Sequence, residues 1–170
     1  TARTFESQTL AEYLPMQRWF AAKAARIETV KLDRLAEMSD GQHVLAIAEV
    51  SVGGEAQRYF LPLSAEWGED ALAMGPRLPA TLAKLRRANK VGTVVDSTVH
   101  DQFARDLLAT LKSSETIETG DGKIVFQGTA ALSDIEDPGE PRLLSAEQSN
   151  ASIAFADSVI LKLYRRWRRG

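Results

Sequence analysis

Residues 147–166 read EQSNASIAFADSVILKLYRR, and this stretch decides the fold of the last part of the chain. It contains two apolar runs rich in β-forming residues, Ile153–Ala156 and Val159–Tyr164, separated by the turn-forming pair Asp157-Ser158. The pattern predicts three strands joined by two tight turns, the last two strands forming a β-hairpin. Lys162 is the one cation inside the second run, and burying an ammonium group is unfavourable unless an anion meets it.

The polar segment Ser149-Asn150-Ala151-Ser152 precedes this hairpin and predicts the first of the two turns. Backbone N–H groups and small hydroxyl or amide side chains at a tight turn suit phosphate oxygens. Turns of serine and asparagine are also common for purely local reasons, and a strand lysine often keeps its head in water on an exposed sheet face. Turn and lysine together, at this spacing, favour an anion site.

The first third of the chain predicts three antiparallel strands packed on an opening helix, which is an α+β unit. Trp19 and Phe20 are expected to fill its core, and His43 to be an ordinary surface or edge residue. The predicted elements are a helix over Phe5–Leu14 ended by Pro15, strands over Ile27–Leu35, His43–Val52 and Gln57–Leu63, and a turn at Gly53-Gly54.

The middle of the chain alternates between helical and strand patterns. Lys84, Arg86, Arg87 and Lys90 form a basic run, interpreted as a solvated helix face. The predicted elements are an irregular segment over Ser64–Gly75, a helix over Pro76–Lys90, a strand over Val91–Val95, a helix over Asp101–Lys112, a hairpin of Ile117–Thr119 with Lys123–Gly128, and a linker over Ala130–Pro141.

Composition excludes several classes of protein. The 170 residues are 44% hydrophobic and 26% charged, which is typical of a globular chain long enough to bury a core. A net charge of −2 argues against nucleic acid as the main partner, and no apolar run approaches the length of a membrane span. The absence of cysteine excludes disulfides and thiolate metal sites, so we expect a soluble cytoplasmic protein.

Three segments together resemble the bacterial maltokinases, which are kinase-like enzymes of the aminoglycoside-phosphotransferase type. They are YLPMQRWFAAK at 13–23, VGTVVD at 91–96 running into the helix Asp101–Lys112, and EQSNAS with VILKLYRR within 147–166. The resemblance implies an α+β fold in which an antiparallel sheet of hairpins with flanking helices forms an N-terminal cap, followed by the first strands of a kinase-like N-lobe. It places the cap at residues 1–130, and the linker with the incomplete N-lobe at residues 131–170.

The resemblance also implies roles for four residues. Ser149, Asn150 and Ser152 would cover the phosphates of ATP, and Lys162 would contact the α- and β-phosphates. Neither of the two histidines begins an H-x-D motif with an asparagine at catalytic-loop spacing. We therefore expect the catalytic base and the ligands of Mg²⁺ to lie in a C-terminal kinase lobe, and the fragment alone to be inactive and to bind ATP weakly or not at all.

By the same resemblance, the full-length enzyme would transfer phosphate from ATP to maltose and give maltose 1-phosphate, and its partner would be a fused trehalose synthase domain. Ala21-Ala22 stands where many maltokinases have two glycines, so we expect a structural role there. Two alternatives stay open: a non-catalytic module that docks a trehalose synthase domain, and the N-lobe of a kinase for another small molecule. Arg165–Arg169, a basic stretch containing Trp167, is interpreted as a continuing strand and a connecting loop, so no nucleic acid is expected.

Overall fold

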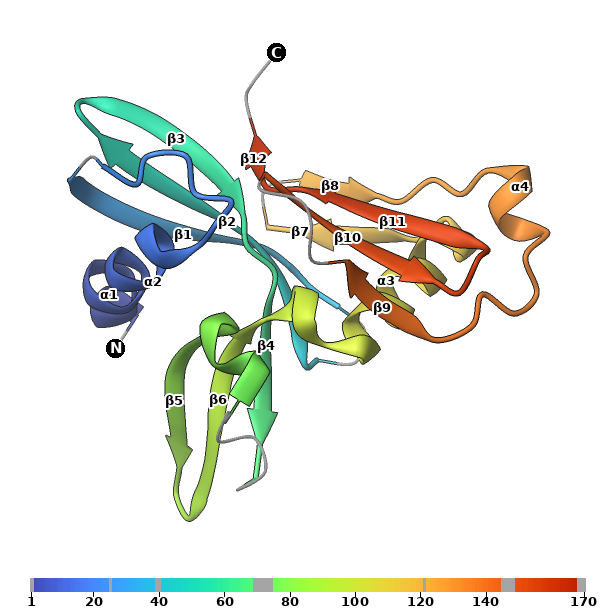
Figure 1. Cartoon of the computed structure of the whole chain (residues 1–170), viewed down its shortest axis with the longest axis horizontal. Coiled ribbons are helices and arrows are strands. Elements are labelled where there is room, and N and C mark those ends of the chain that lie inside the picture. The colour runs from blue at the N-terminus through green and yellow to red at the C-terminus, as the bar shows by residue number, and fades with distance from the viewer. Residues whose placement is uncertain are drawn as a thin grey trace.

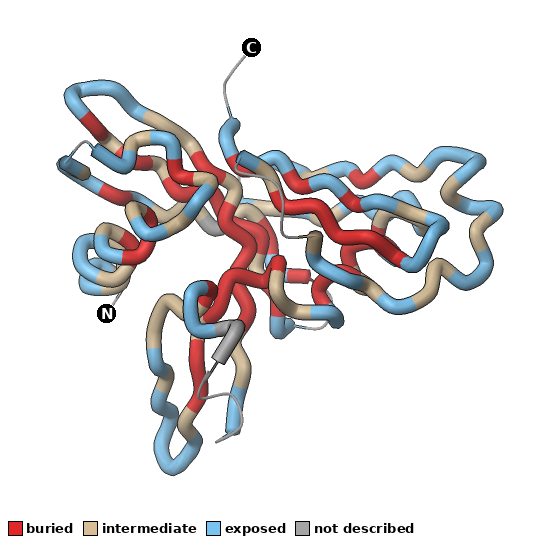
Figure 2. The backbone as a smooth tube through the Cα atoms, viewed as in Figure 1, coloured by how far each residue is buried: buried red, intermediate tan, exposed pale blue. Residues whose placement is uncertain are grey.

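The computed structural model describes residues 2–24, 26–38, 41–68, 75–120, 122–144 and 149–167. It is an α+β fold with two main antiparallel sheets (Figure 1). Buried positions run along the middle strands of both sheets and gather where the sheets approach each other (Figure 2).

The larger sheet has seven strands in the order β12-β3-β2-β4-β6-β5, with β1 also paired to β2. The glycine pair predicted as a turn joins β2 to β3, and both Gly53 and Gly54 have positive φ there. The strands are β1 (Ile27–Glu37), β2 (His43–Val52), β3 (Glu55–Phe60), β4 (Leu63–Trp67), β5 (Thr81–Arg87), β6 (Lys90–Asp96) and β12 (Arg166–Trp167).

One face of β1–β4 packs against the N-terminal helical segment. This segment comprises α1 (Ala2–Thr4), the π-helical stretch η1 (Phe5–Leu10) and α2 (Ala11–Met16). The segment extends past Pro15 to Met16, and the Gln17 N–H then donates a hydrogen bond to the Leu14 carbonyl. Phe20 is buried here and Trp19 packs beside it, as predicted, while Tyr59 contacts both rings. The core is completed mainly by Leu10, Tyr13, Leu14, Val50 and Leu61.

The second sheet has three strands, β9 (Pro141–Leu144), β10 (Asn150–Phe155) and β11 (Val159–Tyr164), in the order β11-β10-β9. The predicted hairpin is β10–β11, with Phe155 paired to Val159 across the turn. The amphipathic helix α3 (Asp101–Ser113) packs on one face of this sheet. The shared core includes Phe103, Leu107, Leu108, Ile153, Phe155, Leu161 and Leu163.

The core under the second sheet draws on residues from both sides of position 130. Met38 and Leu45 contribute from the first sheet, Phe126 from the end of the hairpin β7–β8, and Ile153 from β10. The hairpin itself, β7 (Thr116–Thr119) with β8 (Gly122–Val125), lies where it was predicted. The predicted linker contains the short helix α4 (Ala130–Ser133) and leads into β9.

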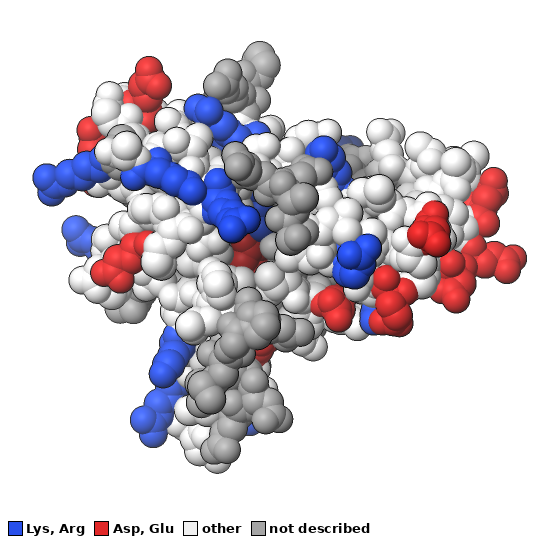
Figure 3. All heavy atoms as spheres, in the orientation of Figure 1, with Lys and Arg blue, Asp and Glu red and all other residues white. Residues whose placement is uncertain are grey.

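The predicted helix over Pro76–Lys90 is wrong. A 3-10 turn, η3 (Gly75–Ala80), is followed by β5, which pairs with β6 from Thr81↔Val95 to Arg87↔Lys90. The ladder to β6 supplies hydrogen bonds that a pattern read on one segment alone does not reveal. The four cations of the basic run are exposed on this hairpin, so their interpretation as a solvated face is confirmed on a strand rather than a helix. Blue side chains follow β5 at the lower left of Figure 3.

Two other predicted strand assignments are corrected. The strand predicted over Gln57–Leu63 is divided at Pro62, which has no N–H to donate, and β4 then runs through part of the segment predicted as irregular. Arg165 and Arg166 do not continue β11. The chain leaves the second sheet at Arg165, and Arg166 and Trp167 form β12, which pairs with Tyr59 and Arg58 of β3 in the first sheet.

Candidate functional site

The sheet β9–β11 has one covered face and one open face. Residues alternate along β11, so Leu161 and Leu163 point into the core against α3 while Ile160, Lys162 and Tyr164 point the other way and are exposed. Ile160 is 68% exposed and Tyr164 is 67% exposed, and they lie on the same face of β11 on either side of Lys162. We call Ser152, Ile160, Lys162 and Tyr164 the open-face cluster.

Ser152 and Lys162 face each other across the β10–β11 ladder. Ser152 is buried and also pairs with Leu144 of β9, so its side chain lies at the centre of the open face, beside the exposed lysine. The Lys162 ammonium lies 5.9 Å from the centroid of the Tyr164 ring. An exposed cation and exposed apolar side chains on one surface suit a ligand that combines an anionic group with an apolar ring.

The structure separates the four predicted site residues. Ser152 and Lys162 lie opposite each other, whereas Asn150 pairs with Tyr164 at the end of the ladder and Ser149 is exposed just before β10. The predicted tight turn over Ser149–Ser152 is therefore wrong, because the strand ladder begins at Asn150. Residues 147 and 148 of the quoted stretch lie outside the described residues.

A buried ion pair joins the end of β11 to the first sheet. The Arg165 Nη2 lies 2.6 Å from Asp96 Oδ2 and donates to Thr98 Oγ1 at 2.8 Å, while its Nη1 donates to the Phe60 carbonyl at 3.3 Å. The guanidinium also lies 4.8 Å from the Trp19 ring centroid. Arg165 is thus fixed from three sides, three residues after Lys162.

This ion pair was not predicted from the sequence. Asp96 begins a turn by accepting a hydrogen bond from the Thr98 N–H at 3.1 Å. Arg165 was interpreted as the continuation of a strand, and no partner was predicted for its side chain, which is 2% exposed. A signal does exist in hindsight, since an aspartate closing a buried strand and an arginine closing another are each expensive to bury alone.

A cavity of about 200 Å³ lies beside this ion pair, and we call it the junction pocket. It is open to solvent on one side and is lined by α2, η3, the end of β6 and the neighbouring ends of β9 and β10. Tyr13 lines it, and burial, reinforced by the nearby Asp96 carboxylate, raises the pKa of the Tyr13 hydroxyl. The other lining residues are Gln17, Trp19, Pro79, Ala80, Asp96, Thr98, Val99, Leu143, Leu144, Asn150, Ala151 and Arg165.

His43 is fully buried, so its predicted place at the surface is wrong. Its Nδ1 lies 2.6 Å from Ser64 Oγ, which in turn lies 2.6 Å from Ser97 Oγ. Its ring packs edge-on against Phe103, with the centroids 5.5 Å apart. The imidazole is held by a buried hydroxyl chain and an aromatic ring, which explains how a polar strand residue fits inside the core.

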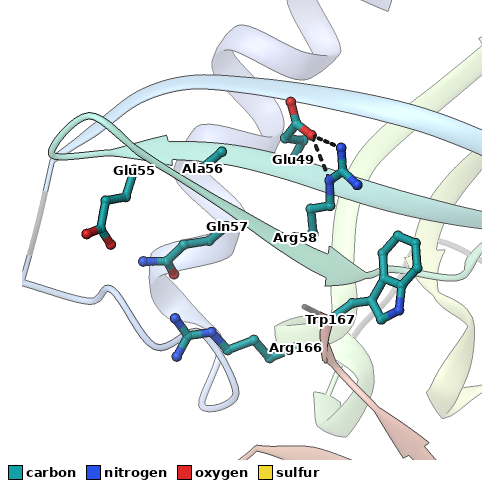
Figure 4. A pocket seen from close by; sticks show the side chains of 7 residues that line it. All are labelled: Glu49, Glu55, Ala56, Gln57, Arg58, Arg166 and Trp167. Atoms are coloured by element: carbon teal, nitrogen blue, oxygen red, sulfur yellow. Dashed lines mark hydrogen bonds and ion pairs between the residues drawn. The ribbon is translucent and has the colours of Figure 1, made fainter. Parts of the chain in front are cut away.

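A second hollow lies at the outer edge of the larger sheet (Figure 4). The Glu49 carboxylate accepts two hydrogen bonds from Arg58, whose guanidinium lies 5.8 Å from the centroid of the Trp167 ring. Gln57 and Arg166 line the hollow on the helix side of β3. The charges of Glu49 and Arg58 compensate each other. The hollow is open to solvent beside the short strand β12.

The described residues contain neither a group of side chains arranged to hold a metal ion nor a helix that could cross a membrane. Among the described residues, no group of three or more histidine, cysteine, aspartate or glutamate side chains is arranged to hold a metal ion. Within the same residues, no helix is long and apolar enough to cross a membrane. Acidic side chains gather instead in the loop after α4, at the right of Figure 3, where Asp134, Glu136 and Asp137 are exposed.

The chain matches a known protein family. The family model described as the maltokinase N-terminal cap domain matches residues 13–101, just over half of the chain. The matched range begins in α2, contains β1–β6 and ends where α3 begins. It therefore includes Tyr13, Trp19 and Asp96 of the junction, and it stops before the open-face cluster.

Proposed function

The chain belongs to the maltokinase N-terminal cap domain family, and from this membership we propose that it is the N-terminal part of an ATP-dependent maltokinase. In the full enzyme, phosphate would pass from ATP to maltose and give maltose 1-phosphate. The strands β9–β11 would be the first strands of the kinase-like N-lobe, lying against the cap. The observation that carries the proposal is the open-face cluster, with Lys162 on a strand whose opposite face is buried against α3.

The open face has the properties that a nucleotide requires. A kinase N-lobe lysine contacts the α- and β-phosphates, and Lys162 lies on the edge strand β11, opposite Ser152 of the middle strand β10. Ile160 and Tyr164 offer apolar surface to a ring on the same face. Ser149 and Asn150 lie at the start of β10, from which they would reach the phosphates.

The proposal assigns the catalytic base and the Mg²⁺ ligands to a second lobe, as phosphoryl transfer in kinases requires. ATP with Mg²⁺ would bind between that lobe and the open face, so the open face alone would hold nucleotide weakly. The exposed Ile160 and Tyr164 support this arrangement, because a second lobe and a nucleotide would cover them.

The test is made on the protein encoded by the complete reading frame. We expect ATP-dependent formation of maltose 1-phosphate, measured by phosphorus NMR, and a loss of about 100-fold in kcat/KM for Lys162→Ala. Lys123→Ala, which removes an exposed lysine on β8, is the matched control and should retain the wild-type rate. A Lys162→Ala enzyme with unchanged kcat/KM would remove Lys162 from the site.

Two other functions remain as alternatives within the same family. If the folded full-length protein uses ATP only with a different acceptor, it is a kinase for another small molecule. If it transfers phosphate to no sugar, a docking role toward a fused trehalose synthase domain is favoured, and the first surface to test is the exposed basic hairpin β5–β6.

A further inference from the structure

Arg165 directly follows β11 and is held by the larger sheet through both its backbone and its side chain. Its carbonyl accepts a hydrogen bond from the Phe60 N–H at 2.7 Å, and its Nη1 donates to the Phe60 carbonyl at 3.3 Å. Its Nη2 donates to Asp96 Oδ2 at 2.6 Å and to Thr98 Oγ1 at 2.8 Å. The end of β3, the end of β6 and the 3-10 turn η4 (Ser97–Val99) therefore all hold the one residue at which the chain leaves β11.

Asp96 is itself held in one orientation. Its Oδ1 accepts a hydrogen bond from the Thr98 N–H at 3.1 Å and another from the Thr98 hydroxyl at 2.8 Å, which leaves Oδ2 to Arg165. Its backbone is paired with Leu63 of β4, and its side chain is almost completely buried. The carboxylate of Asp96 is thus a fixed point of the larger sheet, to which the end of β11 is attached.

Stability alone does not explain why this attachment is ionic. A buried ion pair can often be replaced by apolar side chains with no loss of stability. What apolar contacts do not reproduce is direction, because a guanidinium is planar and donates its hydrogen bonds at fixed angles. The three acceptors of Arg165 come from three different elements, so they fix both the position and the orientation of its side chain.

The position of Arg165 bears directly on the open face. β11 is the edge strand of the second sheet, so in the described part of the chain its backbone pairs with β10 alone. This ladder ends at Tyr164, the residue before Arg165, and the Tyr164 ring lies 5.9 Å from the Lys162 ammonium. A shift of the Arg165 backbone would therefore move Tyr164 first, and with it the surroundings of Lys162.

We propose that Asp96 is a positioning residue for the open face. By holding Arg165 it fixes the end of β11, and so it sets where the Tyr164 ring and the Lys162 ammonium lie. The inference rests on the proposed function, because it takes Lys162 to be the residue that contacts the nucleotide. Misplacing a group by ~1 Å can lower a reaction rate by roughly 100-fold, so even a small shift of this strand would be felt. Asp96 lies within the matched cap range and Lys162 outside it, so the cap would act on nucleotide binding without touching the nucleotide.

The test uses the full-length protein and the variant Arg165→Lys, which keeps a positive charge opposite Asp96 but loses the planar fork. We expect the KM for ATP to rise about tenfold while the KM for maltose stays unchanged. A merely structural defect would lower the amount of folded enzyme, and hence the apparent kcat, but it would leave both KM values as they are.

Two further variants complete the kinetic test. The double variant Asp96→Leu with Arg165→Met leaves no charge buried and should show the same rise in the KM for ATP. Arg58→Lys is the matched control, because Arg58 also pairs with a carboxylate and also lies beside a tryptophan ring. Its KM values should equal those of the wild type.

Hydrogen exchange measures the positioning without any activity. In the same full-length protein without ATP, we expect peptides that cover β11 to exchange about tenfold faster in Arg165→Lys than in the wild type. Peptides that cover β2 should exchange equally in the two proteins, because the loosening is local.

An unchanged KM for ATP in Arg165→Lys would overturn the proposal. So would an equal rise of the two KM values, or faster exchange over the whole chain, since both indicate a general structural defect. If the wild type transfers phosphate to no acceptor, the proposed function fails, and the exchange of β11 alone decides whether Asp96 positions this strand. Faster exchange of β11 in Arg165→Lys would then support the positioning role, and equal exchange would overturn it.

Discussion

Arg165 and Asp96 are separated by 69 positions in the sequence, yet their side chains form an ion pair of 2.6 Å that is almost completely buried. The pair connects the residue that directly follows the strand of Lys162 to the residue that ends β6 in the matched cap family range. Each partner alone would be an uncompensated charge in the protein interior.

Removal of one partner should destabilise the protein strongly. We expect Asp96→Ala to lower the free energy of unfolding by about 3–5 kcal/mol, because Arg165 is left charged and buried. The double variant Asp96→Leu with Arg165→Met should lose less than Asp96→Ala. Urea unfolding followed by circular dichroism measures both.

The control for this prediction is the half-exposed pair of Glu49 with Arg58, whose atoms approach to 2.7 Å. Glu49→Ala should change the free energy of unfolding by less than about 1 kcal/mol. Equal losses for Asp96→Ala and Glu49→Ala would contradict the assigned burial of the Arg165 pair.

Alkaline pH should destabilise the protein through Tyr13. Burial raises the pKa of Tyr13 above the ordinary 10.0, so the folded state holds its proton while the unfolded state releases it. The stability from this proton is therefore complete below about pH 10 and declines above it, by up to ~1.4 kcal/mol per pH unit. Comparing the free energy of unfolding of wild type and Tyr13→Phe across this range isolates the effect. Parallel curves for the two proteins would show that Tyr13 ionises equally in both states.

Gly92 should not tolerate a side chain. A Cβ at this position would lie 2.2 Å from the Glu66 carbonyl oxygen, so Gly92→Ala must push β6 away from β4. We expect a loss of about 1–3 kcal/mol in the free energy of unfolding. Gly120→Ala is the control, since a Cβ there meets nothing within 4 Å, and it should be close to neutral. A neutral Gly92→Ala would mean that the two strands are farther apart.

The neighbouring residues Ile160 and Leu161 lie on opposite faces of β11, so substitutions at these two positions test which face packs on α3. Leu161→Ala should lose about 2–4 kcal/mol, because Leu161 is buried in the core with α3. Ile160→Ala should change stability by less than about 0.5 kcal/mol, because Ile160 is largely exposed. Thermal unfolding of both variants measures the two losses of stability. A larger loss for Ile160→Ala than for Leu161→Ala would mean that the sheet packs on α3 through its other face.

Local patterns predicted those elements whose cause lies within the element. The helix α3 and the strand β2 have strong apolar periodicity, and the turns at Gly53-Gly54 and Asp157-Ser158 have suitable residues. The helical interpretation of β5 failed because its leucines have a spacing that fits a helix, whereas the decisive hydrogen bonds come from β6. Whether a segment at the edge of a sheet forms a strand therefore depends on the neighbouring strand with which it pairs.

The roles of Ser149, Asn150, Ser152 and Lys162 at a phosphate site stay predictions. Lys162 was singled out because a lone cation in an apolar strand needs an explanation, and the structure puts it beside Ser152 on an open face. Tyr13 and Arg165 were missed, since their importance arises only when the end of β11 meets the cap helix. His43 was misplaced for a similar reason, because its hydroxyl partner Ser64 lies on another strand. Contacts between distant segments leave no trace in local spacing.

The shared packing of α3 with β10 and β11 limits how related proteins can exchange parts. A chimera that joined residues 1–130 of this chain to strands from a distant relative would set Phe103 and Leu107 against side chains of foreign volume. The leucines and phenylalanines of α3, β10 and β11 would therefore have to be exchanged together. Recombination in the loop after α4 is expected to preserve stability only when the core residues of the two parents already match in size.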